Sequence, residues 1–174
     1  MRETSARIIE AAAEATGLPE GRVIEHSRAD NLTIPRPRIE LQWLPETYTR
    51  TGRKLGHRKS LQADKRFLKK ELYTAKLQVS ANVLAEDAAW LEAFSPVFVK
   101  AFPRGVNDAS GNWIAIQAER AEWTAAAAPR VGLDTIQVFK NAARLFIIGF
   151  TWRLTEEQEQ QLIKRLTLEI KPSI

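Results

Sequence analysis

The sequence predicts an α/β (α+β) domain in which two helices pack on a mostly antiparallel sheet. Two kinds of periodicity indicate this fold. Residues 39–44 and 72–81 alternate apolar and polar side chains, as strands with one buried face do, whereas residues 5–16 and 86–102 carry apolar side chains at helical spacing. A chain of 174 residues can bury a core of its own, so we expect one domain, residues 1–174.

The N-terminal helix is expected over residues 5–16. Ser5 is suited to cap its first turn, its alanines have high helix propensity, and Gly17 can end it in a left-handed turn. A short strand at residues 22–27 and a proline-led strand at residues 39–44 should follow.

Most of the positive charge lies in one connection. From residue 50 to residue 70 there are nine basic side chains and one acidic one, so this segment carries +8 and the remainder −3 of the net charge of +5. We expect residues 39–48 and 71–81 to form a long antiparallel pair joined by a protruding basic arm, residues 50–70. Because its like charges repel and few of its residues are apolar, the arm should be mobile in an isolated subunit.

The second half predicts a helix at residues 86–102, kinked at Pro96, and a strand at residues 113–122. Residues 145–152 are apolar on both faces, which favours a central strand covered on both sides. The capping box Thr155-Glu-Glu-Gln158 predicts a last helix over residues 156–165. Loops at 107–112 and 125–128 and a short strand at 166–170 complete the expected elements.

Nothing in the sequence marks a catalytic, metal or cofactor site. The absence of cysteine excludes disulfides, thiolate nucleophiles and the common structural zinc sites. His26 and His57 are the only histidines, and neither belongs to a metal-ligand or triad motif. The first residues contain no apolar core of signal-peptide type, so we expect no export signal of the usual kind, and the longest apolar run is far shorter than the ~20 residues of a membrane span. We therefore expect a cytoplasmic product that is not an enzyme and has no membrane partner.

The basic arm has three interpretations. It is a solvated loop without a partner, a weak nucleic-acid contact that works by counterion release, or an arm that docks on an acidic neighbouring subunit. The last helix could supply that acidic surface through Glu156 and Glu157. Trp123, at a strand end, is the tryptophan most suited to a partner contact. The arm residues expected to contact a partner are Arg50, Arg53, Lys54, Arg58, Lys59, Lys65 and Arg66.

The order of elements resembles the tail terminator (tail completion, head–tail joining) proteins of long-tailed bacteriophages and prophages. That order is an amphipathic helix, a proline-led strand, a long polar arm, a returning strand, a helix and a strand meander. The stretches that carry the resemblance lie within residues 36–123: RPRIELQWLPETYTRTGRKLGHRKS, ELYTAKLQVSANVLAEDAAWLEAFSPVFVKAF and NWIAIQAERAEW. The expected helix at 156–165 has no place in the family's pattern.

The resemblance implies a homo-oligomeric, hexameric ring in the virion, assembled in the host cytoplasm. Such a ring stops polymerisation of the tail tube and meets the tail tube protein and the head connector proteins; it has no catalytic residue. Two alternatives stay open. One is a nucleic-acid-binding accessory protein that uses residues 50–70, and the other is a different head–tail joining or tube protein of the same virion.

Overall fold

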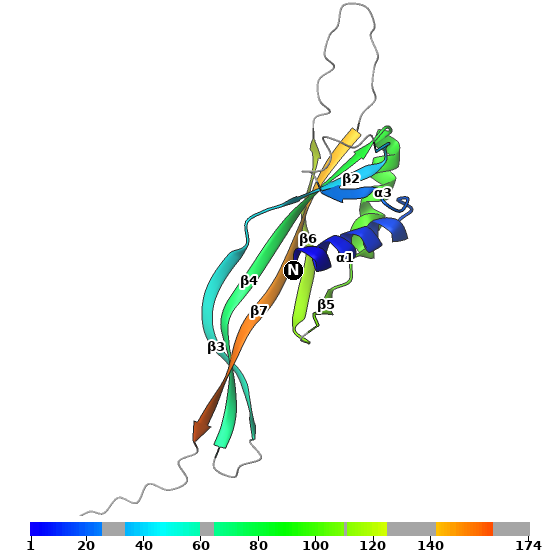
Figure 1. The fold of residues 1–174 in the computed structure, drawn as a ribbon. Coiled ribbons are helices and arrows are strands. Elements are labelled where there is room, and N and C mark those ends of the chain that lie inside the picture. Colours follow the sequence, from blue (N-terminus) through cyan, green and yellow to red (C-terminus); the bar gives the residue numbers. More distant parts are fainter. Residues whose placement is uncertain (26–33, 60–64, 110, 125–141, 162–174) are drawn as a thin grey trace, which may run out of the picture. The chain divides into compact units, whose positions relative to one another are not determined.

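The computed structural model describes residues 1–25, 34–59, 65–109, 111–124 and 142–161. Over these ranges the fold is α+β, with two helices and seven strands in one sheet (Figure 1). The chain divides into two compact units: Met1–Thr47 with Lys76–Trp152, and Tyr48–Ala75 with Arg153–Ile174. His26, the expected loop at 125–128 and the expected strand at 166–170 lie outside the described residues.

The strands follow the order β1-β2-β4-β7-β6-β5, and β3 pairs with β4. The pair β2–β4 is antiparallel as predicted, and β5–β6 and β6–β7 are antiparallel too, while β1 runs parallel to β2. The strand bounds are β1 Val23–Glu25, β2 Arg38–Trp43, β3 Thr47–Lys59, β4 Lys65–Ala85, β5 Gly105–Asn107, β6 Trp113–Thr124 and β7 Ala142–Gln161.

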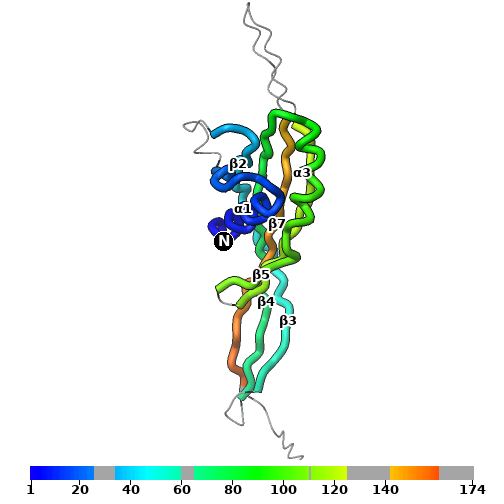
Figure 2. Tube along the Cα trace, turned by 90° about the vertical axis from the view of Figure 1, so that its right-hand side faces the viewer, coloured from blue at the N-terminus to red at the C-terminus, as the bar shows by residue number. Residues whose placement is uncertain are grey.

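The two helices pack on the same side of the sheet (Figure 2). Helix α1, Arg2–Ala15, begins before the expected Ser5: that side chain is buried inside the helix, and its hydroxyl donates to the Met1 carbonyl at 3.1 Å. Ser5 is therefore not the cap. Gly17, with φ +92°, ends the helix as predicted.

Helix α3, Ala88–Ala101, begins where the Asp87 carboxylate accepts a hydrogen bond from the Ala89 N–H at 3.0 Å. Pro96 lies inside the helix, and the Ser95 hydroxyl donates to the Leu91 carbonyl. Leu91, Phe94 and Phe98 face the sheet, as their helical spacing predicts.

The core lies between the helices and one face of β4 and β7. Phe98 is completely buried, and its ring packs edge-on against Phe146 of β7 with 5.3 Å between centroids. Alternate residues of β4 complete this surface, which confirms the strand predicted at 72–81. The buried apolar residues of β4 and β7 here are Leu77, Val79, Ala81, Val83, Phe146, Ile148 and Phe150.

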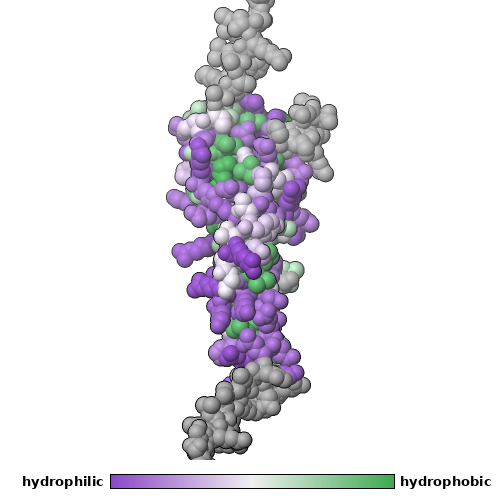
Figure 3. Space-filling model, turned by 90° about the vertical axis from the view of Figure 1, so that its left-hand side faces the viewer, coloured by the Kyte–Doolittle hydropathy of each residue, from purple (hydrophilic) through white to green (hydrophobic). Residues whose placement is uncertain are grey.

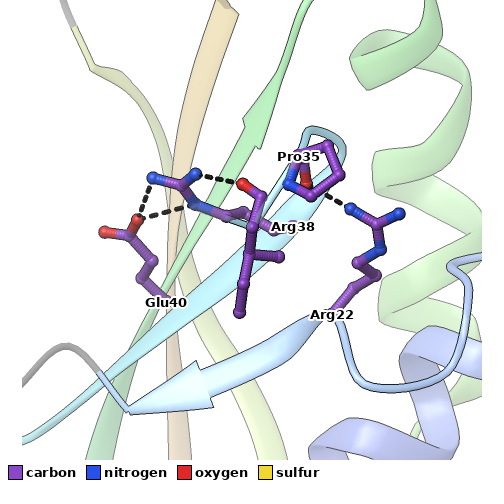
Figure 4. Close-up of polar contacts among 5 residues, drawn as sticks. Arg22, Pro35, Arg38 and Glu40 are labelled. Atoms are coloured by element: carbon purple, nitrogen blue, oxygen red, sulfur yellow. Dashed lines mark hydrogen bonds and ion pairs between the residues drawn. The ribbon is translucent and has the colours of Figure 1, made fainter. Parts of the chain in front are cut away.

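Two arginines hold the segment that leads into β2 (Figure 4). The Arg22 guanidinium donates to the Pro35 carbonyl at 2.6 Å, and Arg38 donates to the Ile34 carbonyl at 2.5 Å. Arg38 also pairs with the buried Glu40 carboxylate at 2.7 Å. These contacts fix the start of β2, whose antiparallel register with β4 pairs Arg38 with Leu84 and Trp43 with Val79.

Two predictions about the charged segments are wrong. Residues 47–59 and 65–70 belong to strands β3 and β4, so this part of the expected arm is paired sheet and not a loop. The expected helix at 156–165 is also wrong in its described part, because residues 156–161 continue strand β7. The physical reason is long-range strand pairing: β3 pairs with β4, and β4 pairs with β7, which carries the acidic residues.

Candidate interaction surfaces

The second compact unit contains a three-stranded ribbon, which we call the basic ribbon: Tyr48–Lys59 of β3, Lys65–Ala75 of β4 and Arg153–Gln161 of β7 (Figure 1). It carries ten basic and four acidic side chains, a net charge of +6. Along β3 every residue except Leu55 is exposed, whereas Leu68 and Glu71 of β4 are buried. The ribbon is thus stabilised by its central strand and presents a long, charged edge strand.

One face of the ribbon, here the carboxylate face, carries two ion pairs; Lys54 and Lys69, which alternation also places on it, have no ion pair with another described residue. The Arg58 guanidinium lies 3.2 Å from a Glu157 carboxylate oxygen and 4.6 Å from the centre of the Phe67 ring. Lys65 pairs with Glu159, also at 3.2 Å. Because strand residues two apart share a face, these contacts place all five side chains on the same side. The acidic end of β7 therefore satisfies basic residues of its own chain.

On the opposite face, which we call the glutamine face, basic side chains donate hydrogen bonds to the side-chain amides of glutamines. The Lys70 ammonium donates to the Gln158 side-chain oxygen at 2.9 Å, and Arg66 donates to that of Gln160 at 3.3 Å. An amide oxygen orients a cation without cancelling its charge. Glu156, whose carboxylate accepts from the Gln158 amide at 3.3 Å, is the one carboxylate on the described part of this face.

The buried Glu71 ties the three strands of the ribbon together. Its carboxylate accepts a hydrogen bond from the Thr74 hydroxyl at 2.7 Å and lies 3.4 Å from the Arg153 guanidinium of β7. Its backbone carbonyl accepts from the Thr51 hydroxyl of β3 at 3.3 Å. These contacts give the carboxylate polar partners that offset its removal from water.

The remaining predicted contact residues of the arm lie on β3. They are Arg50, Arg53, Lys54 and Lys59, and their side chains are exposed. In the described ranges these side chains make no hydrogen bond or ion pair, in contrast to those of Arg58, Lys65 and Arg66. The structure thus brings together the basic and acidic residues predicted from the sequence, but within one chain.

In the first compact unit, one surface of the sheet is covered by no helix of the described residues. Phe146, Ile148 and Phe150 of β7 face the helices, so Leu145 and Ile147 face the opposite side, where they are only half-buried. The prediction that both faces of this strand are covered is therefore wrong for the described residues, because both helices lie on one side. A hydrophobic patch bordered by hydrophilic residues is visible in the view away from the helices (Figure 3). We call this surface the open face, with Leu84, Leu145 and Ile147 as its apolar side chains.

Charged side chains border the open face. Glu119, at a register shift of β6, passes over Gly149 of β7 to reach β4, where its carboxylate pairs with Lys76 at 2.8 Å and accepts from the Gln78 amide at 2.7 Å. A Cβ at position 149 would meet the Glu119 carboxylate, so a larger residue there would displace this side chain from its present position. Arg120, which pairs in register with Ile147, forms an ion pair with Glu122.

Exposed apolar side chains also occur elsewhere in this unit. Val97 and Val99 of α3 are 51% and 38% exposed. Trp123, predicted as a contact residue, is half-exposed beside the Arg144 guanidinium, 5.1 Å from the ring centre. Sequence reasoning missed Trp113, which is 55% exposed although its ring contacts Gly105 of the short strand β5. Only its position at the start of an alternating strand could have indicated this.

Within the described ranges, no group of three or more metal-ligating side chains comes together. In the same part of the chain, no helix is long and apolar enough to cross a membrane. The sequence matches no protein-family model, and no curated protein matches it either.

Proposed function

We propose that this protein is a structural subunit that assembles head to tail into a ring, as a tail terminator at the end of a bacteriophage tail tube. The observation that carries the proposal is the open face. Leu84, Leu145 and Ile147 form an apolar centre with a charged border, the arrangement found in protein–protein interfaces. A sheet of this kind is stabilised when a second layer removes the apolar face from water.

A second apolar surface lies on the other side of the same unit. Val97 is exposed on the outer side of α3, with Ala93 and Pro96, which are also exposed, beside it on the helix. Since α3 and the open face are on opposite sides of the sheet, a contact between them joins two different surfaces of successive copies. Such heterologous contacts generate closed rings when the rotation between subunits closes. In the proposed ring, the outer side of α3 in one copy therefore contacts the open face of the next.

The order of elements gives further support to the tail terminator assignment. The N-terminal helix, the strand after the prolines, helix α3 and the closing strands follow one another in the order that the resemblance implies, although strand β3 stands where the resemblance implies a polar arm. In this proposal the ring contacts the tail tube protein on one side and head connector proteins on the other, in the virion and, during assembly, in the host cytoplasm. It acts through its surfaces and carries out no reaction.

The test is the mass of the purified protein by light scattering, from micromolar to millimolar subunit concentrations, alone and with a tail tube protein. We expect masses above 19.7 kDa that increase with concentration and reach a plateau, as a closed ring requires. A mass that stays at one subunit under all these conditions, including with tube protein present, would exclude the proposal.

A further inference from the structure

The basic ribbon carries an inference that does not depend on the ring. We propose that the glutamine face of the ribbon binds the phosphate backbone of nucleic acid, without reading its sequence. Arg66 and Lys70 are held on this face by Gln160 and Gln158, and they keep their full positive charge because their partners are neutral amides. Both side chains are only half-buried, so an anion can reach them.

Strand β3 adds two cations to the same face. Arg58 lies on the carboxylate face, where it meets Glu157, so the alternation of strand side chains places Arg53 and Lys59 on the opposite, glutamine face. Neither has an ionic partner among the described residues. With Arg66 and Lys70 they make four cations against the single carboxylate of Glu156.

The dimensions suit a run of phosphates. Arg53 and Lys59 are six strand residues apart, about 20 Å at ~3.3 Å per residue. Duplex DNA rises ~3.4 Å per base pair on each strand, so a face of this length spans roughly six base pairs. Four cations on it can neutralise several phosphates and release their counterions.

The composition of the face favours nucleic acid over an acidic protein. Protein interfaces have an apolar centre, whereas nucleic-acid interfaces are polar and strongly positive. The apolar residues that alternation assigns to the glutamine face are Leu68, which is buried, Leu55 and Leu72, which are half-buried, and Leu154, which is 40% exposed; they stand among four cations, so the face is mainly polar and positive. An acidic neighbouring copy is a poor partner, because Glu157 and Glu159 already pair with Arg58 and Lys65.

The experiment compares two double variants of the full chain with equal changes in charge. R66Q/K70Q removes two cations from the glutamine face, and the control R58Q/K65Q removes two from the carboxylate face. Binding to fluorescein-labelled 20-base-pair duplexes and to single strands is measured by anisotropy between 50 and 200 mM NaCl. Melting curves of both variants establish that each is folded.

For the native chain we expect log affinity for the duplex to fall with log salt with a slope of about −3 to −4, since each neutralised phosphate contributes roughly −0.9. R66Q/K70Q should make that slope shallower by about two and weaken binding at least tenfold at 50 mM NaCl. For R58Q/K65Q, the decrease in the logarithm of the affinity should be less than half as large. Equal losses in the two variants, no binding by the native chain at 50 mM NaCl, or tighter binding of polyglutamate than of DNA would each overturn the proposal. None of these results bears on ring assembly, which uses the other compact unit.

Discussion

Replacing Ile147 with glutamate should prevent self-association while leaving the subunit folded. In the monomer the new carboxylate would stand directly across from Arg120 on the solvent side of the sheet, so the subunit tolerates it. In an assembled contact the same charge would be buried in an apolar centre, which is strongly unfavourable. We expect association to weaken at least a hundredfold, about 3 kcal/mol, measured by light scattering or sedimentation.

The head-to-tail arrangement also predicts what happens when two different variants are mixed. V97E alters the other proposed contact surface, on α3, and should also give monomers. A mixture of I147E and V97E subunits should form dimers, because each variant keeps the surface that the other lacks. L154E is the matched control: Leu154 is an exposed apolar residue of β7 outside both surfaces, and this variant should assemble like the native chain. Monomers in the mixture would contradict the head-to-tail contact.

The largest effect on stability is expected for F98A. Phe98 is completely buried, and its ring packs against Phe94 of its own helix, against Phe102 directly after the helix and against Phe146 of the sheet. Removing a buried phenylalanine ring costs about 3–5 kcal/mol, because apolar contact is lost and a cavity stays behind. For a chain of this size the melting temperature should fall by roughly 10 °C.

The control for F98A is V97A, on the exposed side of the same helix, which should change the free energy of unfolding by no more than about 0.5 kcal/mol. Urea unfolding followed by tryptophan fluorescence measures both variants. If the two lose similar amounts, α3 does not pack on the sheet as described.

The core elements could be predicted from the sequence because one of their faces is buried. Ala75, Leu77, Val79 and Ala81 alternate with polar residues and are completely buried, and Leu91, Phe94 and Phe98 follow helical spacing on the buried side of α3. In both cases the apolar residues recur with the period of the strand or the helix, because only the residues on the buried face need to be apolar.

Strand β3 could not be predicted in this way. Both of its faces are exposed except at Leu55, so no alternation of apolar residues marks it, and its glycines and positive charge are typical of a loop. Hydrophobic periodicity reports which face is buried, and it gives no signal for a strand that is solvated on both sides.

The end of β7 shows a local signal that long-range pairing overrides. Thr155-Glu-Glu-Gln158 has the pattern of a helix N-terminus, yet Glu157 pairs with Arg58, 99 positions away, and Gln158 with Lys70, 88 positions away. Helix propensity and capping contribute about 1 kcal/mol or less per residue, which a sheet contact can exceed. The acidic and basic segments were predicted as partners, but only the structure shows that they pair within one chain.

The central claim, that the open face is covered by a second subunit, can be measured at a single position. The chain contains no cysteine, so L145C places one thiol on the open face and L154C places one on the ribbon portion of β7 as a control. The rate of maleimide labelling is determined at subunit concentrations below and above the onset of association. We expect labelling of Cys at position 145 to slow several-fold on association, while the rate at position 154 stays constant; equal rates at position 145 before and after association would contradict the account.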